Sequence, residues 1–144
     1  MNAPDPHFAS RVRESFGRQK AMALIGASLT SVRAGEVVIA LPYREDLTQQ
    51  KGFIHGGILG MIADTACGYA AFSLMPAGGS LVTVEYKMNI LKPGRGALVA
   101  QGKVIRPGRT LTVARAEVYA DDGAHVATML QTLMALPDRP DRPE

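Results

Sequence analysis

One segment of this chain, residues 57–75, is apolar on every side of a helical wheel. Its sequence, GILGMIADTACGYAAFSLM, holds a single charged side chain, Asp64, and it is ended by Pro76 and by Gly78-Gly79. Such a helix must be enclosed, either by the rest of the protein or by lipid. Residues 54–77 are long enough to span a membrane. However, an aspartate in a span costs about 2.5–3.5 kcal/mol and a strand-like sequence follows, so we expect a helix buried in protein and no membrane partner.

The sequence changes to a period of two after this helix. Over residues 82–90, apolar side chains alternate with polar ones, and the apolar positions are Val82, Val84, Tyr86, Met88 and Ile90. This alternation predicts a half-buried strand. Turns at Pro93-Gly94, Pro107-Gly108 and 121–123 delimit three further strands, at about 97–105, 110–120 and 124–136.

The first part of the chain is less regular. Phe8, Val12 and Phe16 recur at the spacing of a short amphipathic helix, which we expect to end before Gly26. Residues 37–41 alternate as a strand after an Ala-Gly turn, and the polar residues 43–54 indicate a loop. The two ends, residues 1–7 and 137–144, have the composition of solvated, disordered segments.

One long apolar helix and one meandering antiparallel sheet must bury their faces against each other. The order of elements therefore predicts an α+β chain with the hotdog fold, an antiparallel sheet wrapped around a central buried helix. A length of 144 residues fits a single domain, 1–144, which we expect to be ordered over about residues 8–136.

The composition narrows the classes of function. Lys and Arg total 16 against 13 Asp and Glu, a mild excess that suits an anionic small molecule. Four Phe, four Tyr and no Trp offer little stacking surface for nucleic acid. Cys67 is the only cysteine and is expected in the core; with no apolar leader at the start, we expect a cytoplasmic protein. No paired cysteines, His-x-x-x-His spacing or G-x-S-x-G motif indicates a metal site or a serine hydrolase, and His7 and His125 have no partner at a useful spacing.

Asp64 is the residue most indicative of chemistry. A carboxylate inside an apolar helix either gains a partner or stays protonated. It is therefore either a structural carboxylate that faces a loop or a wet subunit seam, or a base or nucleophile in a dry pocket. Gly56 and Gly57 start the same helix and allow a ligand to approach the backbone. The first N–H groups of a helix have no internal partners, so they can bind a carbonyl oxygen that becomes an oxyanion.

Gly57 and Asp64 are too far apart to act together in one chain. Seven residues span about 10 Å along a helix axis. One carbonyl group cannot lie within about 3 Å of both groups. If both act on the same substrate, Asp64 must come from a second subunit, so the sequence predicts an active site shared between subunits.

The segment QQKGFIHGGILGMIADTA resembles the signature of hotdog-fold acyl-CoA thioesterases of the PaaI-like (phenylacetate-pathway) branch. In that signature an Asn-containing loop leads through His-Gly-Gly into a helix that carries an Asp nine residues after the His. His55 and Asp64 keep this spacing. The order of elements from about residue 20 to residue 136 agrees with the family, so the resemblance covers most of the chain.

The resemblance implies that the chain hydrolyses acyl-CoA thioesters to the free acid and coenzyme A, without a further cofactor. Gly57 would donate its N–H to the thioester oxygen, and Asp64 would attack the carbonyl carbon or activate a water. His55 would shape the loop and position the substrate, and Thr83 would orient the water or the carboxylate. Gln49 falls where many relatives have Asn. The working form would be at least a homodimer, with a homotetramer expected.

Further residues are candidates for substrate binding. Gly56 permits close approach of the substrate, and relatives meet the phosphates of coenzyme A with charges at the strand ends, here Lys92, Arg95, Arg106 and Arg109. The floor of the acyl pocket would include Ile58, Met61, Tyr69 and Met88. Two other functions stay open: a hotdog protein that binds acyl-CoA without hydrolysis, and a hydratase, for which Glu85 lacks a matching histidine.

Overall fold

A six-stranded antiparallel sheet and one long helix dominate the structure, a computed structural model that describes residues 1–143. The helices are α1 (Phe8–Gly17), α2 (Lys20–Ile25) and α3 (Gly56–Phe72), with a short 3-10 turn at Glu45–Leu47. The strands are β1 (Ser28–Arg33), β2 (Glu36–Leu41), β3 (Ser80–Ile90), β4 (Leu98–Arg106), β5 (Leu111–Ala120) and β6 (His125–Leu136).

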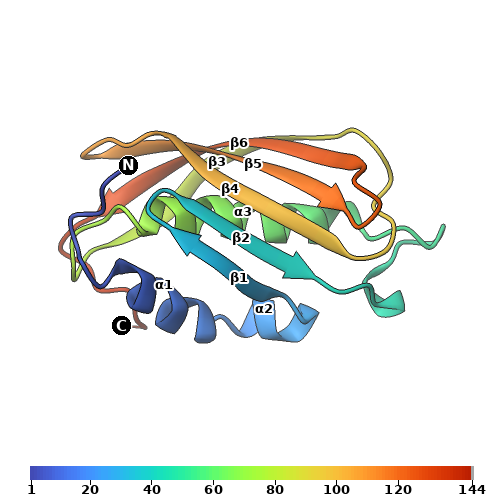
Figure 1. Cartoon of the computed structure of the whole chain (residues 1–144), viewed down its shortest axis with the longest axis horizontal. Coiled ribbons are helices and arrows are strands. Elements are labelled where there is room, and N and C mark those ends of the chain that lie inside the picture. Colours follow the sequence, from blue (N-terminus) through green and yellow to red (C-terminus); the bar gives the residue numbers. More distant parts are fainter. Residues whose placement is uncertain (144) are drawn as a thin grey trace.

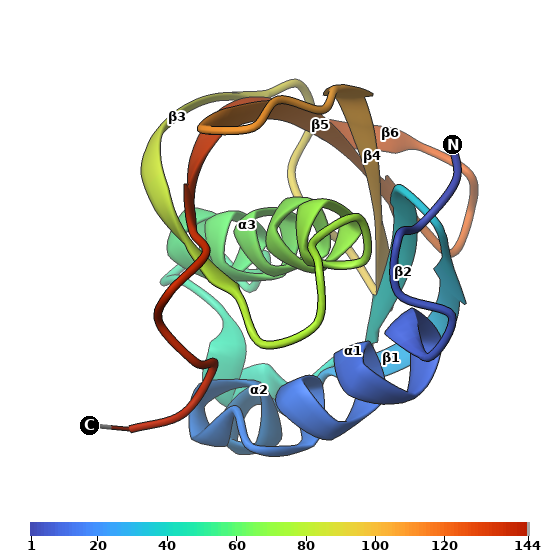
Figure 2. The same cartoon turned by 90° about the vertical axis from the view of Figure 1, so that its left-hand side faces the viewer.

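The sheet curls around α3, as Figures 1 and 2 show. Its strand order is β1-β2-β4-β5-β6-β3. Seen along α3 in Figure 2, β5 and β6 lie above the helix, β3 lies on its left, β4 and β2 lie on its right, and α1 and α2 lie below it. The side between β3 and α2 is left without a strand. The arrangement confirms the predicted hotdog fold.

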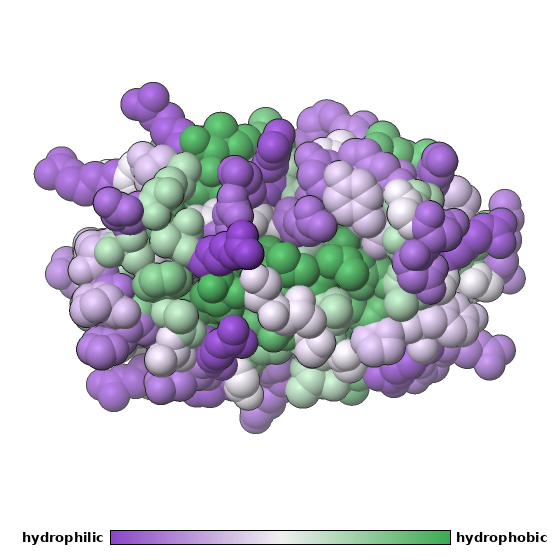
Figure 3. All heavy atoms as spheres, viewed as in Figure 1, coloured by the Kyte–Doolittle hydropathy of each residue, from purple (hydrophilic) through white to green (hydrophobic). Residues whose placement is uncertain are grey.

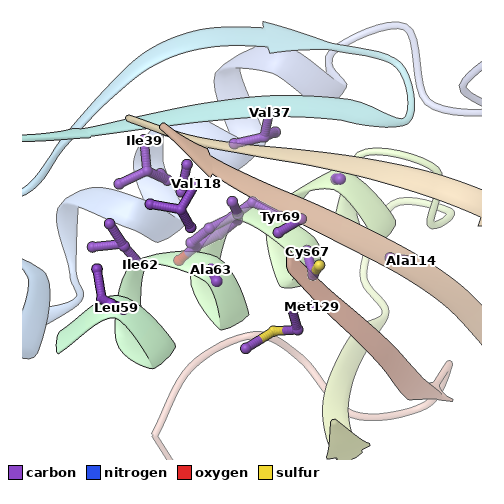
Figure 4. Packing of buried hydrophobic residues seen from close by; sticks show 14 of the residues in the cluster. Val37, Ile39, Leu59, Ile62, Ala63, Cys67, Tyr69, Ala114, Val118 and Met129 are labelled. Atoms are coloured by element: carbon purple, nitrogen blue, oxygen red, sulfur yellow. The ribbon is translucent and has the colours of Figure 1, made fainter. Parts of the chain in front are cut away.

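The core lies between α3 and the concave face of the sheet (Figure 4). Ile62, Ala63 and Ala66 of α3 are fully buried, against strand residues such as Ile39 and Val118. Gly102 on β4 allows the closest approach, because a Cβ atom there would lie 2.2 Å from the backbone oxygen of Ala66. On the face seen in Figure 1, apolar side chains also gather over the middle, where β2 and β4 cross it, bordered by polar ones (Figure 3).

Three expectations about the elements need correction. The predicted N-terminal helix is two helices, since Gln19 between them is extended, with ψ of 98°. β1 was not predicted separately, because its sequence, SLTSVR, alternates poorly; it pairs with β2 through a two-residue turn in which Gly35 has φ of 79°. The last four strands are not a simple meander: β3 pairs with β6 at the sheet edge, and the chain then crosses to β4.

The predicted alternation in β3 is broken by a bulge between Thr83 and Glu85. Before the bulge, Val82 stands opposite the exposed Met134, and Thr83 stands opposite the buried Leu133. Residues opposite each other in an antiparallel pair share a face. Val82 therefore belongs to the outer face, and Thr83, expected on the polar face, turns toward α3. A bulge shifts the two-residue period by one, which a strict alternation does not anticipate.

Both ends of the chain contact the domain. Asp5, which is 7% exposed, pairs with Arg11 at 2.8 Å, and Arg11 also donates to the carbonyl oxygen of Met75 just beyond α3. Near the other end, Arg18 pairs with Asp141 at 2.9 Å. Within residues 1–143, no helix has both the length and the apolar character needed to cross a membrane.

Replacing Gly102 with Ala should destabilise the protein by about 2 kcal/mol or more, because the added methyl group meets helix backbone that cannot move aside. The free energy of unfolding, measured by urea denaturation, checks this. Gly17→Ala is the matched control, since nothing lies within 4 Å of a Cβ atom there, and its effect should stay within about 1 kcal/mol. Equal stability of the two variants would contradict the close contact.

Candidate active site

Asp64 lies on α3 in a three-membered hydrogen-bonded cluster. The hydroxyl of Thr83 donates to Oδ1 of Asp64 at 2.8 Å, and Nε2 of Gln131 donates to the same oxygen. Gln131 Nε2 also donates to Thr83 Oγ1, at 2.7 Å. Asp64 is half-buried, so it is neither unpaired nor fully enclosed. The bulge in β3 matters here, since it turns Thr83 toward the helix.

Gln131 is a site residue that the sequence analysis missed. It lies on β6 with an exposed fraction of 0%, between the buried positions Met129 and Leu133. All three face α3, so a polar side chain interrupts an apolar row. A signal was therefore present in the sequence, because a buried amide in an apolar row of a strand needs a polar hydrogen-bond partner.

The cluster borders a cavity of about 300 Å³. The cavity follows one face of α3 from Asp64 through Gly68 to Phe72, and α2 and β3 contribute Met22 and Leu81 to its wall. Both hydrogen bonds to the carboxylate reach Oδ1, which leaves Oδ2 without a partner among residues 1–143. A carboxylate held by one oxygen at the wall of a cavity can use the other for proton transfer or attack.

Polar groups line the cavity away from Asp64. The hydroxyls of Ser15 and Tyr69 share a hydrogen bond of 3.0 Å, and both residues are 6% exposed. Burial raises the pKa of the Tyr69 hydroxyl, so it stays protonated at neutral pH. Of the predicted floor residues, Met61 and Tyr69 line this cavity, whereas Ile58 and Met88 do not line it and pack against the hydrophobic core.

The other candidate groups gather at the N-terminus of α3. His55 caps the helix, and its Nδ1 accepts the N–H of Gly57 at 2.8 Å. Nδ1 must then be unprotonated, and in the neutral ring the proton lies on Nε2. The expected oxyanion donor, Gly57, is thus already engaged in this structure. The N–H of its neighbour Gly56 has no acceptor among residues 1–143.

Gly56 borders a second cavity, of about 380 Å³, which shares no lining residue with the first. Gln49, Lys51 and Lys92 also line it. The amide oxygen of Gln49 accepts the backbone N–H of Lys51, so it is used within its own loop. This loop is fixed to the β3–β4 connection, because the N–H of Ile54 donates to Gly94 at 2.9 Å.

The four candidate cations do not come together in one chain. Lys92 and Arg95 lie in the β3–β4 connection, near the start of α3, and Arg95 stacks over the ring of Phe53 at 4.5 Å. Arg106 is the last residue of β4 and Arg109 follows it, so both lie at the opposite end of that strand, and both are exposed. Nine strand residues separate the two pairs by about 30 Å.

The remaining reactive side chains are not part of the cluster. Cys67 is fully buried. Burial is the main cause that raises the pKa of its thiol, and the negative charge of the nearby Asp64 raises it further. His125, for which no partner was expected, contacts Glu117 at 2.7 Å on the neighbouring strand. Glu85 binds the hydroxyl of Thr132 at 2.6 Å on the outer face, away from the cavity that a hydratase would use. Within the described chain, no three His, Cys, Asp or Glu side chains are grouped to hold a metal ion.

A carboxylate at a cavity wall and, at the start of the same helix, a backbone N–H that can bind an oxyanion are the groups that thioester hydrolysis requires. A model of the thioesterase superfamily matches residues 51–127, more than half of the chain, and the chain therefore belongs to the thioesterase superfamily. This membership, and 34% identity to putative esterases of Halobacterium salinarum and Saccharolobus solfataricus, support hydrolysis of thioesters or esters.

Solved structures agree with this assignment. A thioesterase family protein from Silicibacter pomeroyi is 48% identical with a TM-score of 0.87, over 90% of this chain and 98% of that one. The PaaI protein of the E. coli phenylacetic acid degradation operon has a TM-score of 0.82 at 23% identity, over 90% and 94% of the two chains, and shares the fold. A Streptococcus mutans protein solved with acetyl-CoA bound is 26% identical with a TM-score of 0.72, over 78% and 90%.

The buried, neutral thiol of Cys67 should not react with a thiol reagent such as DTNB at pH 8 in the native protein, because only the thiolate attacks and access is blocked. In denaturant, one thiol per chain should react. The denatured sample is the control for reagent activity. Stoichiometric labelling of the folded protein within minutes would contradict the core position.

Proposed function

We propose that the protein is a hydrolase of acyl-CoA thioesters from the PaaI-like branch, with Asp64 as its catalytic carboxylate. The observation that carries the proposal is the carboxylate itself: Oδ1 is held by Thr83 and Gln131, and Oδ2, at a cavity wall, has no partner in the described chain. A protein that only binds acyl-CoA has no need for such a group. The proposed location is the cytoplasm, where coenzyme A esters are formed.

Two routes for Asp64 follow from chemistry. As a general base, it takes a proton from a water, whose oxygen adds to the thioester carbonyl carbon. As a nucleophile, it attacks that carbon directly and forms an anhydride, which water then hydrolyses. In both routes the carbonyl oxygen becomes an oxyanion, the C–S bond breaks, and the thiolate of coenzyme A leaves and is protonated. Both routes need a hydrogen-bond donor for the oxyanion.

For that donor we propose the N–H of Gly56, in place of Gly57. Gly57 donates to His55, whereas the N–H of Gly56 has no acceptor within the part of the chain that the structure describes; both lie in the first turn of α3, at the positive end of the helix dipole. The same bond supports the expected role of His55 in shaping the loop. It also leaves Nε2–H of His55 free to contact the substrate.

The proposed site is shared between two subunits. Gly56 and Asp64 lie on one continuous helix, so eight residues hold them about 12 Å apart. They also border two cavities without a common lining residue. Each cavity is half of a site, and a second copy completes it by bringing its Asp64 to the first copy's Gly56.

The edge strand β3 supports this assembly. It has a neighbour on one side only, β6, and exposes apolar side chains: Val84, Tyr86 and Ile90 are 54%, 48% and 51% exposed. Unpaired edges with apolar side chains favour pairing with another chain. We propose a homodimer formed through β3, and a homotetramer of two such dimers.

The proposed binding of coenzyme A follows from the positions of the cations. Lys51 and Lys92 border the cavity at Gly56, where a phosphate-bearing ligand would meet positive charge. Arg95 lies in the same connection. Arg106 and Arg109 are about 30 Å away along β4, so they can reach that coenzyme A only from another subunit.

Asp64→Asn should lower kcat/KM by about a hundredfold or more, because the amide neither takes a proton nor attacks. The fold and the affinity for a coenzyme A ester should be retained, since the Asn oxygen still accepts from Thr83 and Gln131. Hydrolysis is measured on the best ester from a panel of short, medium, long and aryl-acetyl coenzyme A esters. The exposed Asp138→Asn is the control, with unchanged activity expected. More than half of wild-type kcat/KM in Asp64→Asn would refute the assignment.

Mixing two inactive variants tests the shared site. Gly56→Pro removes the proposed donor at a helix position that accepts proline, and His55 before it already has a suitable ψ of 137°. After reassembly with Asp64→Asn, random pairing makes half of the dimers mixed, each with one intact site, so activity should return to about a quarter of wild type.

The matched control is Gly56→Ala, which meets Ile90 with the same added Cβ but keeps the N–H, and it should stay active. Background activity in the mixture, with mixed dimers confirmed by mass spectrometry, would exclude a shared site. If Gly56→Ala were also inactive, the loss of activity in Gly56→Pro would be caused by the contact of the Cβ atom and not by removal of the N–H.

A further inference from the structure

We infer that Gln131 is a positioning residue for Asp64: it fixes the carboxylate so that Oδ2 faces the reacting carbonyl group. The inference rests on the proposed function, since it gives Gln131 a role through the catalytic carboxylate. Gln131 does not border the cavity, so it acts on the substrate only through Asp64 and Thr83.

The hydrogen-bond directions support this role. An ionised carboxylate only accepts, so the Gln131 amide must present Nε2 to Asp64. Nε2 lies within hydrogen-bond distance of both Asp64 Oδ1 and Thr83 Oγ1, so the amide group binds both residues. The Thr83 hydroxyl then has its own hydrogen to donate to Asp64. The closed cluster therefore fixes the rotation of the carboxylate and the direction of the hydroxyl together.

The backbone that carries Gln131 is rigid. β6 is an interior strand, paired with β5 on one side and with β3 on the other. Gln131 stands opposite Ala114 of β5 and Tyr86 of β3. A functional side chain held on an interior strand is positioned more accurately than one on a loop. Thr83, by contrast, lies on the edge strand and next to a bulge, and its hydroxyl contacts Gln131.

The amide is also retained at a cost. Gln131 is 0% exposed, and its Oε1 has no hydrogen-bond partner among residues 1–143. A buried carbonyl oxygen without a donor is destabilising, and an apolar side chain of the same shape would avoid that cost. Since Nε2 reaches only Asp64 and Thr83, the benefit of keeping an amide here lies in those two contacts.

Gln131→Met is the test, because methionine has nearly the same shape and no amide. The single-turnover rate of hydrolysis should fall about tenfold or more, KM should stay within about twofold, and the thermal midpoint should not fall. The substrate is the coenzyme A ester on which the wild type is fastest. Leu133→Met, at the next inward position of β6, is the matched control and should keep wild-type rate and KM.

A second experiment places the effect at Asp64. In an Asp64→Asn background, Gln131→Met should cause no further loss, because the two residues act as one unit. If Asp64→Asn itself stays active, the proposed function fails. If Asp64→Asn is inactive but Gln131→Met keeps more than half of the wild-type rate, only the inference about Gln131 fails.

A purely structural role for Gln131 gives a different pattern. The thermal midpoint would then fall, KM would rise together with the loss in rate, and Leu133→Met would behave similarly. Gln131→Leu serves as a second apolar variant, with the same expected loss of rate and unchanged KM. Failure of both apolar variants to fold would overturn the inference, since it predicts that the fold tolerates them.

Discussion

The enclosure of α3 is the constraint on which the rest of the structure depends. Its apolar side chains face every direction, so it cannot lie on a protein surface with one side in water. The sheet meets this demand by curling, and Gly102 lets β4 approach the helix backbone more closely than any residue with a Cβ atom would allow. A six-stranded sheet still ends at an edge, and β3 leaves the side of the helix toward α2 without a strand (Figure 2).

Asp64 lies at that boundary, where α3 passes from strand cover to the cavity. Asp64 is only partly buried, so it needs fewer hydrogen-bond partners than a carboxylate in the core. Both of its hydrogen-bond donors come from the sheet. One is on the edge strand and depends on a bulge, and the other is on an interior strand and costs an unsatisfied amide oxygen. Local rules of strand alternation and core composition are broken at these two places, as is common at functional sites.

The sequence predicted the parts of the fold that depend on local period. The all-apolar helix and the strands β4, β5 and β6 follow from spacing and turn residues alone. The position of β3 beside β6 could not be predicted in this way, because long-range pairing decides which strand lies at the edge and the local sequence carries no pattern for it. Thr83 was identified through family resemblance, while the alternation placed it on the wrong face. Gln131 was missed because its meaning depends on Asp64, 67 residues away in the sequence.

The N-terminus of α3 explains why activity and assembly would be linked under the proposed function. A helix start has several free N–H groups, and His55 uses one of them to fix the loop, which leaves the N–H of Gly56 for a ligand. The same helix carries its carboxylate two turns further on, out of reach of that N–H. In a two-fold dimer, whatever one chain offers its partner is offered in return. A single dimer contact through β3 would therefore complete both sites at once, and a separated chain would hold two halves and no whole site.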